Sequence, residues 1–483
     1  MSKNRGRAQK QPPAARPLLL RELYPPAATG GAAFSGAPAS DAAPGGAAYH
    51  SGPVSGDGPA NLLVEGDNLP LLEALCEGPL RDFALKAGGL KLLYLDPPFA
   101  VGADFYTDSA LGPHKCLAYR DSWPGGLTGY LDMMRARLLL AHRALAADGC
   151  LFLHCDSRVS HHLRLMLDEI FGPERFLGEI IWHYTGGGRA RRWFSRKHDS
   201  IFHYAVSANW HFDPDAARLP YKPGSGYARS GIVSAAGKRY LPHPDGSPVD
   251  DVWDIPMVNP LAAERSGYPT QKPLALLERI LAVCSRPGDL TADFFCGSGT
   301  LALAAARLGR RWICADRSPL AVQTARLRLL AQQYADFALA VPVQEQEQEQ
   351  NWREARLPYG KLRYRLEARL RLERRGRGLL AHLEDIAVHF DSALPRSAAG
   401  QSAPLPQKGL DWLRAWGLSL PLDPDCVPPC LAPDSLSRRA LWRTLRCQKR
   451  GIALCSPELP LPKGRPLLDL EDIFGNSVCL DIS

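Results

Sequence analysis

The chain has 483 residues, 45% of them hydrophobic and 22% charged, with a formal net charge of +8. This length predicts two or three domains with the composition of an ordinary globular protein. No apolar run approaches the roughly 18 residues of a membrane span, and the basic, polar N-terminus lacks the apolar core of a signal peptide. We therefore expect a cytoplasmic protein with no membrane partner, and the basic excess slightly favours a polyanionic one.

Composition divides the chain into segments. Residues 1–60 are rich in Ala, Gly, Pro and Ser, which predicts disorder, although RPLLLRELY (16–24) could dock as a short element. Residues 61–343 alternate strand-like and helix-like stretches, interrupted by a Gly-, Arg- and aromatic-rich insert at 184–268. A polar linker, QEQEQEQ (344–350), precedes a C-terminal region at 351–483 of unknown role.

The predicted elements of 61–343 begin with a short strand at 61–67 and a helix at 68–78. A hydrophobic strand follows at 90–96, then a long amphipathic helix over 129–149, a second buried strand at 150–156 and a helix at 160–172. After the insert come a helix (273–285), a strand (289–295), a helix (299–309), a strand (311–316) and a helix (318–339). This alternation predicts an α/β fold, a doubly wound and mostly parallel sheet.

Two features of the C-terminal region invite interpretation. Residues 351–375 hold nine basic and three acidic residues, and the pattern RYRLEARLRLERR suggests a basic helix. Four thiols could ligate zinc, but their spacing differs from the tight pairs of most zinc ribbons. The favoured interpretation is four unrelated cysteines, Cys426, Cys430, Cys447 and Cys455, and no metal site is predicted.

A glycine turn joins the strand at 289–295 to the next helix, in DFFCGSGTLALAAARLGRRWICAD (293–316). Glycines allow a tight turn and bring the backbone close to a ligand, and Asp316 ends the next strand where it could bind ribose hydroxyls. The spacing of Gly297, Gly299 and Ala302 fits a dinucleotide fingerprint. It equally fits the Phe-x-Gly-x-Gly turn that binds S-adenosylmethionine, with Asp293 preceding, or a plain β–α turn.

Three motifs in order resemble the β-group of DNA amino-methyltransferases, which includes the modification subunits of type III restriction systems. They are Asp96-Pro97-Pro98-Phe99, the Thr-Gln-Lys-Pro run that ends in Lys272 and Pro273, and DFFCGSGT. A dehydrogenase explains neither the proline pair nor the Thr-Gln-Lys-Pro run. The resemblance spans about residues 61–330. It implies an S-adenosylmethionine-dependent methyltransferase fold with a recognition insert and a smaller C-terminal region.

The resemblance also implies chemistry. The Asp96 carboxylate and the Pro97 carbonyl would accept hydrogen bonds from a base amine, Pro98 would fix the turn, and Phe99 would stack on a base that has left the duplex. An aspartate in the first position resembles the adenine-N6 enzymes, so adenine is favoured. The alternatives are cytosine N4, an RNA substrate, or a catalytically weak DNA-binding relative. The residues expected at the cofactor are Asp67, Lys272, Pro273, Asp293, Phe295, Gly297, Gly299, Thr300 and Asp316.

Double-stranded DNA is the expected partner, with a restriction subunit or a second copy of the chain as further candidates. In GGGRARRWFSRKH, basic residues beside two aromatic residues could contact phosphates within a flexible loop. The expected DNA-binding residues are Arg189, Arg191, Arg192, Arg196 and Lys197. Two departures from the family pattern, neither at the main acceptors, shift the expectation slightly toward a weak or specialised enzyme. Ala100-Val101 stands where many relatives have Asn and a small residue, and Leu301 stands where many repeat threonine.

Overall fold

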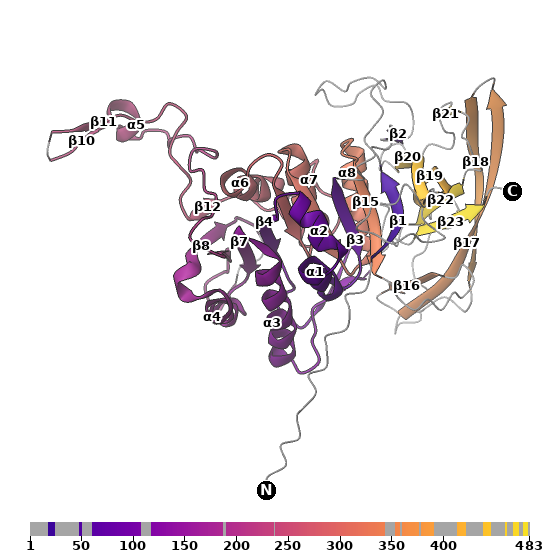
Figure 1. The fold of residues 1–483 in the computed structure, drawn as a ribbon, viewed down its shortest axis with the longest axis horizontal. Coiled ribbons are helices and arrows are strands. Elements are labelled where there is room, and N and C mark those ends of the chain that lie inside the picture. The colour runs from indigo at the N-terminus through magenta and orange to yellow at the C-terminus, as the bar shows by residue number, and fades with distance from the viewer. Residues whose placement is uncertain are drawn as a thin grey trace, which may run out of the picture.

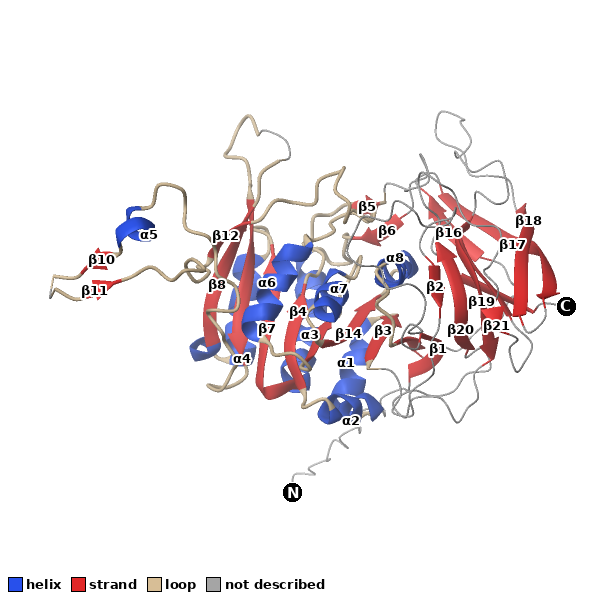
Figure 2. Ribbon diagram, turned by 90° about the horizontal axis from the view of Figure 1, so that it is seen from above, coloured by secondary structure: helices blue, strands red, loops and turns tan. Residues whose placement is uncertain are grey.

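The computed structural model describes residues 18–24, 48–50, 60–107, 117–186, 190–235 and 237–342, and beyond these only the C-terminal strands at 353–357, 360–375, 378–390, 413–421, 438–445, 459–460, 467–472 and 477–481. A 15-stranded sheet runs through these segments in the order β12-β8-β9-β7-β4-β13-β14-β3-β15-β1-β20-β19-β22-β23, with β2 beside β20. Figures 1 and 2 show this sheet crossing the molecule. No helix among the described residues combines the length and apolar character that a membrane crossing requires.

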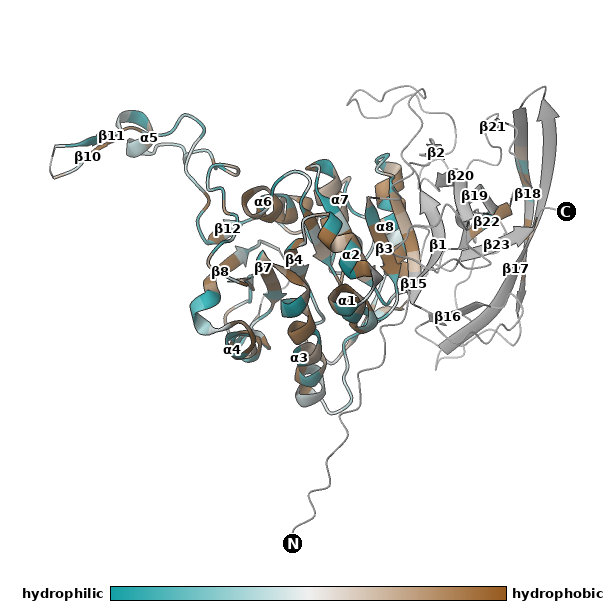
Figure 3. Ribbon diagram, viewed as in Figure 1, coloured by the Kyte–Doolittle hydropathy of each residue, from teal (hydrophilic) through white to brown (hydrophobic). Residues whose placement is uncertain are grey.

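The methyltransferase-like part of the sheet is mostly parallel, as predicted. Its strands are β3 (Asn61–Glu65), β4 (Leu90–Leu95), β7 (Leu145–Cys155), β8 (Phe176–His183), β9 (His198–Ala205), β12 (Val252–Asp254), β13 (Leu290–Asp293), β14 (Arg311–Asp316) and β15 (Phe337–Pro342). Within this set β9 runs antiparallel to both β7 and β8. Buried on both faces, the central strands are apolar along their length, as their brown colour in Figure 3 shows.

Helices cover both faces of this sheet and enclose two cores. One face carries α1 (Asn68–Glu77), α2 (Pro79–Lys86), α3 (Leu127–Ala144) and α4 (Ser160–Phe171). The other carries α6 (Leu274–Cys284), α7 (Thr300–Arg307) and α8 (Pro319–Ala331). The predicted long helix ends at Ala144, and β7 takes over the rest of that stretch because Leu145 already pairs with Leu90 of β4.

The predicted insert at 184–268 contains a strand of the central sheet. Residues 198–205 form β9, whose side chains are buried after His198. Two separate excursions remain. The first is the loop 184–197 between β8 and β9. The second is an arm that carries α5 (Gly226–Ser230), β10 (Ile232–Val233) and β11 (Arg239–Tyr240), and it projects beyond β12 in Figure 1.

The prediction of a basic helix in 351–375 is wrong. That segment forms β16 (Arg353–Leu357) and β17 (Gly360–Arg375), and β17 pairs with β18 (Gly378–Phe390), beside which lies β21 (Leu459–Pro460). The charges and leucines of KLRYRLEARLRLERR alternate with a period of two, which is the repeat of a strand and not of a helix. The numbers of basic and acidic residues in the segment do not reveal this alternation.

The N-terminal segment contributes two strands, although the sequence predicts disorder for most of it. The stretch RPLLLRELY supplies β1 (Leu18–Tyr24), and β2 (Ala48–His50) lies farther on. β1 joins β15 on one side to β20 (Arg438–Leu445) on the other. Through it the sheet continues to β19 (Leu413–Pro421), β22 (Leu467–Asp472) and β23 (Ser477–Asp481). The linker 344–350 and the four cysteines weighed as zinc ligands lie outside the described residues.

Candidate active site

A pocket of about 750 Å³ opens at the carboxyl ends of the parallel strands. Ligands of open α/β sheets bind at this edge, and the volume lies within the usual range for small-molecule sites. Two further strands, β5 (Asp104–Tyr106) and β6 (Leu117–Arg120), form a hairpin whose residues also line it. Most of the residues predicted from sequence line this pocket, namely Asp67, Asp96, Pro97, Pro98, Phe99, Lys272, Asp293, Phe295, Gly297, Thr300 and Asp316.

Two predicted residues do not line the pocket. Pro273 is the N-cap residue of α6. Gly299 has a left-handed φ of +73°, and a Cβ there would lie 2.5 Å from the Cβ of Ala325 on α8. The lack of a side chain at Gly299 therefore allows α8 to pack closely against the turn. At Gly297, with φ +50°, a Cβ would instead meet the ring of Tyr268, which lines the pocket, at 3.2 Å.

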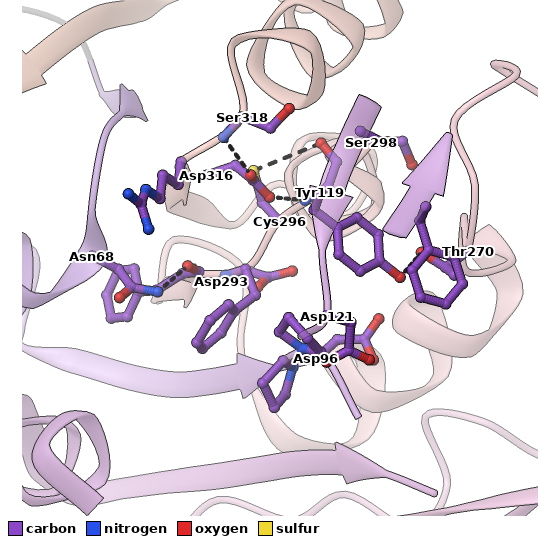
Figure 4. Close-up of a pocket in the computed structure, with 18 of the residues that line it drawn as sticks. Asn68, Asp96, Tyr119, Asp121, Thr270, Asp293, Cys296, Ser298, Asp316 and Ser318 are labelled. Atoms are coloured by element: carbon purple, nitrogen blue, oxygen red, sulfur yellow. Dashed lines mark hydrogen bonds between the residues drawn. The ribbon is translucent and has the colours of Figure 1, made fainter. Parts of the chain in front are cut away.

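Asp316 is bound to the glycine turn. Its two carboxylate oxygens accept hydrogen bonds from the backbone N–H of Gly297 and of Ser318, each at 2.8 Å, as Figure 4 shows. Burial raises the pKa of Asp316 to about 6, although these hydrogen bonds oppose the shift. The carboxylate thus closes both strand-to-helix turns around one end of the pocket.

The glycine turn has a second anchor in Asp293. This buried carboxylate accepts a hydrogen bond from the Phe295 N–H at 2.9 Å, and burial raises its pKa well above the usual range. The neighbouring Phe294 carbonyl accepts from Asn68 at 2.6 Å. These bonds connect the turn after β13 to the start of α1.

Asp67 has the structural role that its position suggests. Its side chain accepts a hydrogen bond from the Leu69 N–H at 2.9 Å, as an N-cap residue does. Arg137 of α3 donates to Asp67 at 2.7 Å and to Asn68 at 2.5 Å. The Asp67 side chain is still 43% exposed within the pocket, so a second role in binding a ligand is compatible with the cap.

Asp96 follows β4 and lies at the other end of the pocket. Its Oδ2 accepts from the Lys272 ammonium at 2.5 Å. Its Oδ1 is buried and has no hydrogen-bond partner. Buried acceptors are rarely left unpaired, so an acceptor of this kind at the head of a pocket fits a ligand that brings its own N–H donor.

Asp121, which the sequence did not single out, organises the turn after Asp96. It is almost fully buried, with 1% of its surface exposed. Its carboxylate accepts from the backbone N–H groups of Phe99, Ala100 and Val101, at 3.1, 2.9 and 2.9 Å. Ala100 has φ +53°, a conformation that L-residues rarely adopt. Nothing local links Asp121 to this turn, since β5 and β6 lie between them in the chain.

The side chains beside Asp96 form an apolar wall with polar contacts. The Phe99 ring stacks on His154 with centroids 5.9 Å apart, and the Lys272 ammonium lies 5.4 Å from the Phe99 centroid. Across the pocket, Tyr119 stacks on Phe105 at 4.7 Å and its hydroxyl donates to Thr270 at 3.4 Å. A planar ring could enter between such aromatic faces.

Of the predicted DNA-binding residues, Arg189 lies outside the described residues. The other four, Arg191, Arg192, Arg196 and Lys197, lie in the loop between β8 and β9, where Trp193 and Phe194 are 70% and 98% exposed. Because β4 and β7 are parallel and β9 is antiparallel to both β7 and β8, this loop leaves the same edge of the sheet as Asp96. The arm, in contrast, leaves the far end of β9.

Comparison with known proteins agrees with this site. Residues 90–326 match the family model described as DNA methylase, and the α/β domain of the chain belongs to that family. The chain is 28% identical over 296 residues to the type II methyltransferase M.EcaI of Enterobacter cloacae. This match covers 49% of this chain and 64% of that protein. It is 27% identical over 256 residues to the DNA adenine methyltransferase YhdJ of Escherichia coli, covering 53% of this chain and 77% of that protein.

A shorter match and a solved structure extend the comparison. The type II methyltransferase M1.MboII of Moraxella bovis is 35% identical over 150 residues, 29% of this chain and 57% of that protein. The PvuII DNA methyltransferase structure, described as cytosine-N4-specific, is 17% identical with a TM-score of 0.39, and it covers 59% of this chain and 98% of that one. Family membership rests on the sequence matches.

Proposed function

We propose that the chain is an S-adenosylmethionine-dependent DNA methyltransferase that methylates the N6 amine of adenine. The observation that carries this proposal is the unpaired, buried Asp96 Oδ1 in a pocket that also contains the glycine turn and Asp316. The similarity to a named adenine methyltransferase supports adenine as the base. An amine that enters the pocket would supply the hydrogen bond that Asp96 lacks.

The residues of the pocket fit the cofactor. Asp316 and Asp67 offer carboxylates for hydroxyl and amine groups, while Phe295 and the turn at Gly297 offer an apolar face and close backbone. When bound, S-adenosylmethionine would supply an electrophilic methyl group on a sulfonium. In this proposal these residues only bind and orient it.

The catalytic contribution of the chain is made at Asp96 and Pro97. Hydrogen bonds from the N6 amine to the Asp96 carboxylate and the Pro97 carbonyl would favour a tetrahedral nitrogen with an available lone pair, and they strengthen as positive charge develops. Phe99 would stack on the base and fix its plane. Holding the amine on the line of attack supplies much of the remaining acceleration.

The test is direct. The full chain is incubated with methyl-labelled S-adenosylmethionine and either unmethylated DNA or RNA, and the product is digested to nucleosides and separated. Label in N6-methyldeoxyadenosine is the expected result. Label in N4-methyldeoxycytidine, label only in RNA, or none while the cofactor still binds would each contradict the proposal.

We also propose that the loop 184–197 contacts the DNA backbone beside the flipped base. Support comes from its four exposed or half-exposed basic residues and from its place at the edge of the sheet that holds Asp96. Arg191→Gln should weaken DNA binding about fivefold and reduce the slope of log affinity against log salt by about one. An unchanged slope would place the backbone contacts elsewhere.

A restriction subunit remains a proposal for the partner. The chain is 31% identical over 128 residues to a probable type III modification subunit of Haemophilus influenzae, of which it covers 14%. Co-purification of the chain with a nuclease from its own source would support such a partner, and a methyl transfer reaction complete in the isolated chain would show that none is needed for modification.

A further inference from the structure

A row of buried polar side chains lies behind Asp96. The Tyr94 hydroxyl is 2.7 Å from His154 Nδ1, and His154 Nε2 is 3.2 Å from Asp199 Oδ2. The Tyr184 hydroxyl donates to Asp199 Oδ1 at 3.2 Å. The His154 side chain has no exposed surface. These residues come from β4, β7, β9 and the position directly after β8, so the row exists only because β9 is inserted beside β7.

The row ends close to the free oxygen of Asp96. His154 Nδ1 lies 4.0 Å from Asp96 Oδ1, while Lys272 occupies Asp96 Oδ2 at 2.5 Å. An ion pair with an ammonium is made by a carboxylate and not by a carboxylic acid. A proton that remained on Asp96 would therefore sacrifice this ion pair.

The hydrogen bonds define the roles of the two imidazole nitrogens. Asp199 is an acceptor, so Nε2 carries a hydrogen, and in the neutral ring Nδ1 accepts from the Tyr94 hydroxyl. Although burial opposes the shift, the hydrogen bond and charge of His154 lower the pKa of Asp199. A carboxylate is thus in place to stabilise an imidazolium, as in other sites where a buried carboxylate orients a histidine.

We infer that His154 is a positioning residue that acts through Asp96 and accepts the proton lost by the substrate amine. The inference rests on the proposed function. As the N6 lone pair forms its bond to the methyl carbon, the carbon–sulfur bond breaks and its electron pair stays on sulfur. The nitrogen, now positively charged, loses one hydrogen as a proton to Asp96 Oδ1. The Tyr94 hydroxyl first turns its hydrogen away from His154 Nδ1, the freed lone pair takes the proton from Asp96, and the protonated Nδ1 then donates to the Tyr94 oxygen.

Several groups face His154 and share its electrostatics. Tyr94 and Asp96 come from β4 and the turn that follows it, Asp199 from β9, and Lys272 from the segment before α6. Trp182 of β8 packs edge-on at 5.5 Å between centroids and Phe99 stacks on the other side. Of the charged groups, two are carboxylates and one is an ammonium, so a proton on His154 is balanced within the site. These charged groups are Asp96, Asp199 and Lys272.

Three variants test the inference. His154→Phe keeps the ring stacking and removes both nitrogens. Asp199→Asn keeps the hydrogen bond to Nε2 and removes the charge that would stabilise imidazolium. The control is His203→Phe, because His203 is also a buried histidine stacked on an aromatic ring, Phe152, at 4.1 Å, but its Nε2 has no hydrogen-bond partner.

The measurement is single-turnover methyl transfer to DNA from pH 5.5 to 9, with cofactor and DNA affinities measured on the same samples. We expect His154→Phe to reduce the rate about 100-fold at neutral pH, within the usual range for a lost proton acceptor. Both affinities should stay within about threefold. Its rate should keep rising with pH where the wild type levels off. Asp199→Asn should slow transfer about tenfold, and His203→Phe should match the wild type.

Three outcomes would overturn the inference. They are a wild-type rate and pH profile in His154→Phe, a uniform loss at every pH that equals the loss in affinity, and an equal loss in His203→Phe. If His154→Phe does not fold, Asp199→Asn decides in the same way. A wild-type chain that transfers no methyl group would instead refute the proposed function, so the two failures are distinguishable.

Discussion

Asp96 and Asp316 both stand at the carboxyl ends of buried parallel strands and both line the same pocket, but their hydrogen bonds differ. Asp316 is paired on both oxygens by backbone N–H groups of two turns. Asp96 is paired on one oxygen by Lys272 and has a free oxygen on the other side. Figure 4 shows the two carboxylates at separate ends of the cluster. A carboxylate whose two oxygens each accept a backbone N–H holds its loops in place and keeps lone pairs for a further donor, whereas a buried oxygen without any partner selects a ligand that brings one.

The largest expected effect follows from the open oxygen. Asp96→Ala should reduce methyl transfer about 30- to 1,000-fold, since removing one charge-assisted acceptor in a desolvated site costs roughly 2–4 kcal/mol in the transition state. Cofactor affinity, measured by calorimetric titration, should change only a few fold. Loss of both activity and cofactor binding in a folded variant would mean that Asp96 lies at the cofactor and not at the base.

The turn beside Asp96 should be the next most sensitive point. Asp121→Ala removes the acceptor of three backbone N–H groups in one buried turn, and each donor left unpaired costs about 1–3 kcal/mol. We expect a rate 10- to 100-fold lower and a clearly lower free energy of unfolding in urea. Asp156→Ala, which removes a buried aspartate whose carboxylate accepts hydrogen bonds from the neighbouring Arg158, is a control that should retain more than half of the activity.

The two glycines of the turn have different roles, which substitutions can separate. At Gly299 a Cβ would lie 3.0 Å from the Ala325 backbone, whereas at Gly297 the nearest atom belongs to the Tyr268 side chain. Gly299→Ala should therefore lower the free energy of unfolding by about 1–3 kcal/mol through overpacking. Gly297→Ala should cost less stability and weaken cofactor binding more. The reverse ranking would show that Gly299, as the sequence motif suggests, is the glycine that faces the ligand.

The raised pKa of Asp316 predicts a pH dependence of stability. Its pKa in the folded chain is about 6, against 3.8 for the ordinary group. Between these values the folded state binds more protons than the unfolded state, so the free energy of unfolding falls as pH rises from about 4 to 6, and the loss persists above 6. Relative to Asp316→Asn, the wild type should lose about 1–2 kcal/mol over this range. The free energies of unfolding are measured in urea at each pH. A free energy of unfolding that changes with pH by the same amount in both proteins would contradict the assignment.

The smallest expected effect concerns Ala100, which has φ +53° between Asp96 and Gly102. Asparagine tolerates this left-handed conformation better than alanine does. Ala100→Asn should raise the melting temperature by a few degrees, equivalent to roughly 0.5–1 kcal/mol, and leave methyl transfer unchanged. A loss of activity would mean that a small side chain at position 100 is required by the incoming base.

The sequence predicted those parts of the site that depend on local pattern. Asp96 and Asp316 each end a hydrophobic run, and the carboxyl ends of parallel strands meet at one edge of a sheet, so their convergence followed from the β–α alternation. Asp121 was not predictable because its bonds cross a hairpin. The contact between His154 and Asp199 was not predictable because it depends on a strand that runs antiparallel within the sheet. The strand β17 was predictable from the two-residue alternation of its charged and apolar residues. The helix was predicted instead because the interpretation relied on net charge, which does not distinguish a helix from a strand.

The position of β1 has a consequence for how the chain reaches its final form during synthesis. Leu18 pairs with Pro342 and Glu22 pairs with Arg438, so β1 must wait for partner strands that are made hundreds of residues later. Contacts of such high sequence separation form slowly because a long loop must close before they are gained. Until β15 and then β20 emerge, two sheet edges remain open to other chains. β1 therefore cannot complete its place in the sheet until β20 has been made.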